Sequence, residues 1–164
     1  MSCLSGGEYL GASMVGKTPR ARKNDKQRME TIAKHCSCLP CLLVGYLDVH
    51  ATIEHVTERG RRAGKGSEVH QHTIGLCTWH HFGHTPNHVT RQKMSGDRGP
   101  SLVWGRTTFE EFFGDEVTVL LPCQDFMLDL FDETPWPEYS VPGKIARKVR
   151  DHWITLNHAT HRTA

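Results

Sequence analysis

The chain has 164 residues, a formal net charge of +2 and a hydrophobic fraction of 37%. This length suits one modest core with extensions. The longest apolar runs, such as LLVGYL, are far shorter than the roughly 20 residues that cross a bilayer. The N-terminus has no basic stretch followed by an apolar segment and a cleavage site. We therefore expect a soluble, cytoplasmic protein without a secretory signal or membrane contact.

Charge is distributed unevenly along the chain. Residues 17–66 contain 11 Lys/Arg and 5 Asp/Glu, whereas residues 108–138 contain 9 acidic residues and no basic one. A basic front half could contact nucleic-acid phosphates, or it could be an ordinary solvated face, and charge alone favours neither interpretation. We expect the acidic stretch to be a solvated face.

The first half of the chain predicts one helix and several extended segments. Residues 1–16 are rich in Gly and Ser and predict a disordered leader. A basic amphipathic helix should follow, because Met29, Ile32 and Ala33 fall at helical spacing. The stretch CLPC predicts a tight turn, and ATIEHV, with its β-branched residues, predicts a strand. The glycine-rich loop of residues 58–66 is a candidate for phosphate contacts through Arg59, Arg61, Arg62 and Lys65.

The second half predicts a short strand and then mainly helices. The strand should run through Thr73 and Ile74, and a helix should start near Thr78, which is the one residue there that resembles a cap. Another helix is expected from Thr107 to Phe113, with Thr107 or Thr108 as its cap and Gly114 as its stop. A basic amphipathic C-terminal helix is indicated by the helical spacing of four apolar residues: Ile145, Val149, Trp153 and Leu156.

The cysteines predict a structural zinc site. Cys38 and Cys41 form a Cys-x-x-Cys pair, and Cys77 with His80 forms a Cys-x-x-His pair further along. A gap of two residues lets one turn or helix start direct two ligands at a single tetrahedral ion. In a cytosolic chain, six cysteines are more typical of metal ligands or free thiols than of disulfides. Cys36 in place of Cys38 is an open alternative.

Other residues near the zinc pairs predict a second, catalytic ion. If the ATIEHV strand packs on the helix near Thr78, Glu54 and His81 could hold that ion, and His55 could take a proton from water. His84 lies near His81 in helical space and is a candidate for a further ligand. We expect Trp79 and Trp104 to pack in the core or between helices rather than to stack on bases.

Four ordered motifs carry a resemblance to a known family. They are IAKHCSCLPCLLVG, TIEHVTERGRRAGKG, TIGLCTWHHFG and GRTTFEEFFGDE, and the similarity around them runs from about Lys17 to Leu121. The sequence resembles HNH (His-Me finger) endonucleases and, more closely, the phage RecA-dependent nucleases related to the recombination enhancement function protein. The resemblance implies a metal-dependent DNA endonuclease of phage recombination that acts in the cytoplasm of the bacterial host with a RecA filament on single-stranded DNA.

The resemblance also implies roles for individual residues. His55 would be the general base, Glu54 would replace the first histidine of the family's strand motif as a metal ligand, and His81 would be the second ligand. A carboxylate at position 54 suits Mg²⁺ or Mn²⁺. Val103 stands where the family usually has a further histidine, so His84 or His88 would have to supply a third ligand. No Asn between strand and helix is present to orient the base.

We therefore expect an α+β fold, with a small ββα-metal (HNH) core, a structural zinc, flanking helices and loop-rich extensions. The expected domains are a disordered leader (1–16), an HNH-like nuclease domain (17–121) and a C-terminal extension with a basic amphipathic helix (122–164). The alternative function is a zinc-stabilised nucleic-acid-binding module without catalysis, suggested by the departures at Glu54 and Val103.

Overall fold

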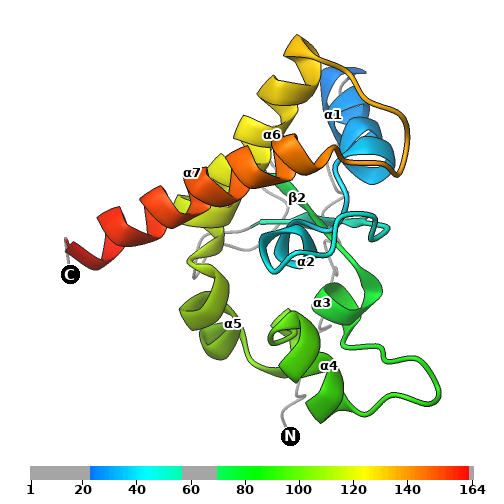
Figure 1. Ribbon diagram of the computed structural model, residues 1–164, viewed down its shortest axis with the longest axis vertical. Coiled ribbons are helices and arrows are strands. Elements are labelled where there is room, and N and C mark those ends of the chain that lie inside the picture. The colour runs from blue at the N-terminus through cyan, green and yellow to red at the C-terminus, as the bar shows by residue number, and fades with distance from the viewer. Residues whose placement is uncertain (1–22, 57–69, 163–164) are drawn as a thin grey trace, which may run out of the picture.

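A computed structural model describes residues 23–56 and 70–162 (Figure 1). In these ranges, helices surround a single two-stranded antiparallel sheet, which confirms the predicted mixture of helix and strand. The predicted leader and the four basic loop residues lie outside the described residues: Arg59, Arg61, Arg62 and Lys65. Within the described ranges, no helix is long and apolar enough to cross a membrane.

The first predicted helix is confirmed, but the predicted Cys-Pro-Cys turn is wrong. Helix α1 runs from Lys23 to His35 and buries Ile32. A short helix, α2 (Leu39–Leu43), replaces the turn. Pro40 lies in the first turn of α2, where a missing backbone N–H removes no helical hydrogen bond. Pro40 therefore lies at the start of a helix instead of forming a turn.

The sheet is followed directly by a short helix. Strand β1 (Thr52–His55) pairs antiparallel with β2 (Thr73–Leu76), with Thr52 opposite Leu76 and His55 opposite Thr73. Helix α3 (Thr78–Phe82) begins one residue after Cys77, so the N-cap is Cys77 and not Thr78 as predicted. The chain thus forms strand, strand and helix in that order, with residues from all three packed together.

Three short elements follow α3. They are α4 (Arg91–Arg98), the 3₁₀ helix η1 (Leu102–Trp104) and α5 (Arg106–Phe113). Helix α5 matches the predicted range and ends before Gly114, but its N-cap is Gly105 rather than a threonine. Trp79 is buried as predicted, whereas Trp104 is 53% exposed, so the prediction that it packs in the core is wrong.

The last part of the chain completes the main core. A π-helical segment, η2 (Glu116–Leu120), leads into α6 (Leu121–Glu133), and α7 (Gly143–Arg162) packs against α6 and α2 (Figure 1). Helix α7 buries Ile145, Ala146 and Val149, and it is the predicted C-terminal helix. Helix α6 was not predicted and carries buried side chains, so part of the acidic stretch is core rather than solvated face.

Candidate metal centre and active site

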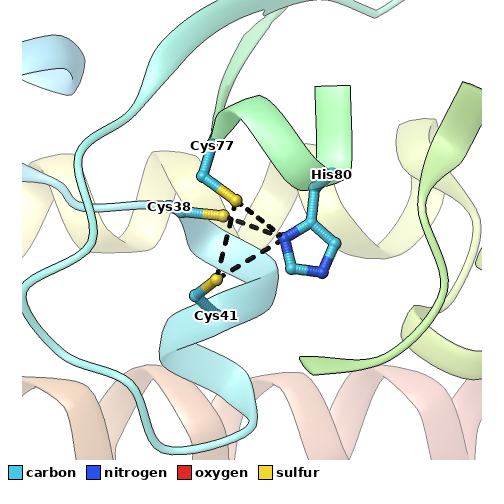
Figure 2. A group of neighbouring side chains, drawn as sticks. All are labelled: Cys38, Cys41, Cys77 and His80. Atoms are coloured by element: carbon cyan, nitrogen blue, oxygen red, sulfur yellow. Dashed lines mark hydrogen bonds between the residues drawn. The ribbon is translucent and has the colours of Figure 1, made fainter. Parts of the chain in front are cut away.

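Three cysteines and one histidine converge between α2 and α3 (Figure 2). Cys38 and Cys41 come from the start of α2, Cys77 precedes α3, and His80 lies one turn into α3. All four residues are buried, and their ligand atoms lie within 4.8 Å of one another. The Nδ1 atom of His80 is 3.3 Å from the Sγ atoms of Cys38 and Cys77 and 3.5 Å from that of Cys41.

These separations fit a single tetrahedral metal ion. With bonds of about 2.3 Å to sulfur and about 2.0 Å to nitrogen, tetrahedral zinc places neighbouring sulfurs about 3.8 Å apart and sulfur about 3.5 Å from nitrogen. The Sγ atoms of Cys41 and Cys77 are 3.8 Å apart. His80 Nδ1 lies at the ideal distance from the sulfur of Cys41 and slightly closer to those of Cys38 and Cys77. The four side chains could therefore hold one metal ion with little rearrangement.

Surrounding groups orient the histidine and one of the thiols. The Nε2 atom of His80 lies 3.0 Å from the carbonyl oxygen of Arg98 and donates to it. The proton is then on Nε2, which leaves the lone pair of Nδ1 directed at the three sulfurs. The Arg98 guanidinium lies 3.6 Å from the Cys41 sulfur and would partly offset negative charge there. This is the outer support that a metal-binding histidine ordinarily has.

The thiols are not equivalent in their acidity. Burial raises the pKa of Cys38 well above its ordinary range, while hydrogen bonds from Cys38 and Cys41 lower the pKa of Cys77. Three buried thiolates at these distances would repel one another strongly unless a cation joined them. The cluster is therefore suited to a divalent ion, which would displace the remaining thiol protons.

The structure decides between Cys36 and Cys38. Cys36 lies in the main apolar core, outside the group that could hold a metal, and burial raises its pKa to about 12. A neutral, buried thiol of this kind behaves as a small apolar side chain. The pair that could bind a metal is therefore Cys38 with Cys41.

A second group of polar side chains lies where β1 meets α3. The Nε2 atom of His81 is 2.6 Å from Oε2 of Glu54, and both side chains are largely buried, with 18% and 19% exposed. On the other side of the imidazole, Nδ1 lies 2.9 Å from the hydroxyl of Thr52, which donates its own proton to the carbonyl of Leu76 at 2.8 Å. Nδ1 of His81 must therefore be the donor to Thr52. Nε2 then faces Glu54 at a distance that requires a proton, or a cation in its place, between nitrogen and carboxylate.

His55 lies beside this pair and has a partner that the sequence did not suggest. Its Nε2 atom is 3.1 Å from Nδ1 of His70, in the turn before β2. Burial and the charge of His70 lower the pKa of His55, and the charge of Glu54 acts in the opposite direction. His55 is therefore neutral at ordinary pH, as a proton acceptor must be.

The histidines considered as a third ligand lie apart from this pair. His84 is exposed, and its ring centroid is 5.8 Å from that of Phe82. His88 is also exposed. In the described part of the chain, neither residue joins Glu54 and His81 in a group of three ligand atoms within 4.8 Å. The structure thus brings Glu54 and His81 together without a third protein ligand from this set.

A buried carboxylate near Glu54 was also missed. Glu116, at the start of η2, is 2% exposed, and its Oε1 atom forms an ion pair with the guanidinium of Arg106 at 3.0 Å. Burial raises the pKa of Glu116 to about 7 against the effect of Arg106, and the charge of Glu54 adds to the rise. Arg106 and Glu116 both lie in the motif GRTTFEEFFGDE, but no pattern within that motif indicates that Glu116 lies near Glu54.

In a comparison with protein families, residues 21–128 match the family described as recombination enhancement, RecA-dependent nuclease. The chain belongs to this family. The matched range contains both polar groups described above and ends within α6. Comparisons with curated proteins and with solved structures gave no significant match. Membership in this family indicates that the chain is a nuclease. Helix α7 lies outside the matched range.

Proposed function

We propose that this member of the RecA-dependent nuclease family is a metal-dependent DNA endonuclease of the HNH type. The observation that carries the proposal is the approach of His81 to Glu54 at 2.6 Å, with His55 as the next residue of the same strand. A carboxylate and an imidazole that meet in a partly buried site, next to a neutral histidine, are the parts needed for hydrolysis of a phosphodiester. The strand, strand and helix order supports an HNH core.

The first metal would be a structural zinc bound by four side chains, Cys38, Cys41, Cys77 and His80. Four protein ligands leave no open position for substrate, so this ion would not take part in the reaction. By joining the start of α2 to α3, the ligands would fix α3, which carries His81, relative to the rest of the core.

Glu54 and His81 would hold the second ion, and Mg²⁺ or Mn²⁺ suits their oxygen and nitrogen donors. When bound, such an ion would stabilise the negative charge that develops on the phosphate and on the leaving 3′-oxygen. Thr52 accepts from Nδ1 of His81 and so orients Nε2 toward Glu54, and the ion would take the place of the proton between these two atoms. His84 stays a candidate for a further ligand, since binding of the ion could draw its exposed side chain inward.

His55 would act as the general base. Its lowered pKa keeps it neutral, so it can accept a proton from the attacking water at ordinary pH. His70, 3.1 Å from Nε2 of His55, would orient the ring in place of the missing asparagine. The proton taken from water would then reside on an imidazole that already has a hydrogen-bonding partner.

DNA binding would depend first on phosphate contacts. Arg59, Arg61, Arg62 and Lys65 are proposed to contact the backbone, with little selectivity for sequence. The family's description suggests that these residues and the rest of the nuclease domain (17–121) would act in recombination with RecA. We further propose, from the sequence resemblance, that this is phage recombination in the cytoplasm of the host, on DNA carried by a RecA filament. The extension from residue 122 onward would support this domain, since α7 buries three apolar side chains in the same core.

A cleavage assay tests the proposal. Purified protein is incubated with Mg²⁺ or Mn²⁺ and with circular single-stranded or duplex DNA, in the presence and absence of RecA and ATP. We expect cutting that requires the divalent ion and increases with RecA. DNA binding without cutting under every condition would instead support the zinc-stabilised binding module.

A further inference from the structure

Three large apolar side chains are exposed next to the Glu54–His81 pair. Phe82 ends α3 and is 47% exposed, while Val103 and Trp104, in η1, are 56% and 53% exposed. They are neighbours, because Val103 and Trp104 lie against Gly83, the residue that follows Phe82. We call Phe82, Val103 and Trp104 the apolar ledge. Clusters of exposed apolar side chains next to polar sites commonly mark binding surfaces.

The apolar ledge is held rigidly. The indole N–H of Trp104 donates to the carbonyl oxygen of Gly83 at 3.3 Å. Gly83 has a φ of +69°, and a Cβ atom there would collide with the indole of Trp104. A glycine is thus required for this close approach. A surface that is already ordered loses little conformational entropy when it binds a ligand.

The ledge is continuous with the candidate active site. The ring of Phe82 stacks on the ring of His81 with centroids 3.9 Å apart and an interplanar angle of 17°. His81 in turn contacts Glu54. A strand whose phosphate lies at Glu54 and His81 would therefore pass its adjacent base over Phe82 and toward Trp104.

Charge at the ledge favours a nucleic acid over an apolar protein surface. The guanidinium of Arg91 lies 3.3 Å from the centroid of the Trp104 ring, and Arg91 is exposed. Cationic groups interleaved with aromatic rings are typical of surfaces that bind single strands, where bases stack on the rings and phosphates meet the cations. Bases within a duplex have both faces covered by their neighbours, so an unpaired strand is the better fit.

We propose that the apolar ledge binds an unpaired DNA base that flanks the scissile phosphate. The base would stack on Phe82 and Trp104, with Arg91 beside the adjoining phosphate. This inference rests on the proposed nuclease function for the position of the scissile phosphate. It adds a specificity for unpaired nucleotides that the metal sites alone would not provide.

Binding of a fluorescent oligothymidylate, measured by anisotropy without added Mg²⁺ or Mn²⁺, tests the proposal apart from cleavage. Trp104→Ala and Phe82→Ala should each raise the Kd by about 5- to 100-fold, the range found when a base-stacking side chain is truncated. Phe112→Ala is the matched control, because Phe112 is 51% exposed but contacts Phe113 instead of the ledge. Trp104→Phe should restore most of the affinity, whereas a purely structural role of the indole N–H predicts no rescue.

A second arm removes the base instead of the side chain. Wild type should bind an oligonucleotide with a single abasic position more weakly than the intact strand. For the abasic strand, Trp104→Ala should lower the affinity much less than it does for the intact strand. Unchanged affinity of Trp104→Ala for the intact strand would overturn the proposal. So would normal DNA binding combined with loss of stimulation by RecA, which would assign the ledge to a protein partner. If stacking is found but no DNA is ever cut, the nuclease proposal fails and the ledge proposal stands.

Discussion

The imidazole of His81 is held between Thr52 and Glu54, with Nδ1 2.9 Å from the threonine hydroxyl and Nε2 2.6 Å from the carboxylate. Because Thr52 donates its only proton to Leu76, its hydroxyl oxygen accepts from Nδ1 of His81. This contact sets the orientation of the ring, so that Nε2 faces Glu54 before any metal arrives. A strand residue thus orients the candidate metal ligand on the helix.

Thr52→Val should weaken binding of the catalytic ion. Valine has nearly the shape of threonine but cannot accept from His81, so the imidazole loses its orientation. Loss of such an outer partner typically costs about 10- to 100-fold in metal affinity or activity. The measurement is the Mn²⁺ concentration that gives half-maximal cleavage. Thr52→Ser keeps the hydroxyl and should stay near wild type, and equal behaviour of the two variants would contradict this role.

Cys38→Ala should remove one zinc per chain and destabilise the core. Binding free energy at a structural zinc site is largely folding free energy, so the thermal midpoint should fall sharply. Metal content by mass spectrometry and a thermal melt are the two measurements. Cys36→Ala is the matched control, since Cys36 is equally buried but lies outside the metal-binding group. It should keep its zinc and lose only the small stability expected of a minor core truncation.

The pH dependence of cleavage should report on His55. Because burial and His70 lower its pKa below 6.5, His55 stays neutral as the pH falls through that value. The acid limb of kcat/KM should therefore have its midpoint below pH 6.5. His70→Ala removes one of three lowering effects, the others being burial and the charge of His81, and should move the midpoint upward. A midpoint above 6.5 in wild type would argue against His55 as the base.

Glu116 should make stability depend on pH. Its pKa is about 7 in the folded chain and near 4.5 when unfolded, so the folded state holds more protons between these values. The free energy of unfolding should then fall as pH rises from about 4.5 to about 7 and stay level above that. The effect is on the order of 3 kcal/mol.

Glu116→Gln tests this expectation by urea unfolding at pH 5 and pH 8. In Glu116→Gln, the free energy of unfolding should lack the fall that Glu116 causes between pH 5 and pH 8. The variant should also be more stable than wild type at pH 8, because it no longer buries a charge there. Arg106 is 38% exposed and would remain solvated without its partner. The groups that face Glu116 are Arg106, Glu54, Glu110 and Asp115. A decline of equal size in both proteins would assign it to other groups.

Local sequence spacing predicted the group of four side chains that could hold a metal ion, because a gap of two residues lets one turn direct both members of a pair at the same ion. The same spacing could not choose between Cys36 and Cys38, since that choice depends on which thiol faces α3 and which faces the core. Helical periodicity predicted α1 and α7. Helical periodicity is present in α6 as well, where the buried residues Cys123, Met127 and Leu130 recur at helical intervals. The acidic residues between them led to the prediction of a solvated face instead of a buried helix.

The contacts around the candidate catalytic residues could not be read from spacing. Glu54, His55 and His81 were predicted from the resemblance and from the strand and helix around them. Their partners Thr52, His70 and Glu116 come from three separate segments, and only the tertiary arrangement brings them to the site. Trp104 was expected to pack in the core or between helices, but η1 lies at the surface and leaves this residue 53% exposed.

The most direct test of the nuclease account compares wild type with His55→Ala in single-turnover cleavage, alongside DNA binding and a thermal melt. His72→Ala is the matched control, because His72 is an exposed histidine just before β2, whereas the ring of His55 contacts His70 and the carboxylate of Glu54 contacts His81. We expect His55→Ala to cleave DNA at least about 100-fold more slowly than wild type, which is the contribution of a general base, while DNA binding and stability stay unchanged. Equal cleavage rates of His55→Ala and wild type would contradict the role of His55 as the general base.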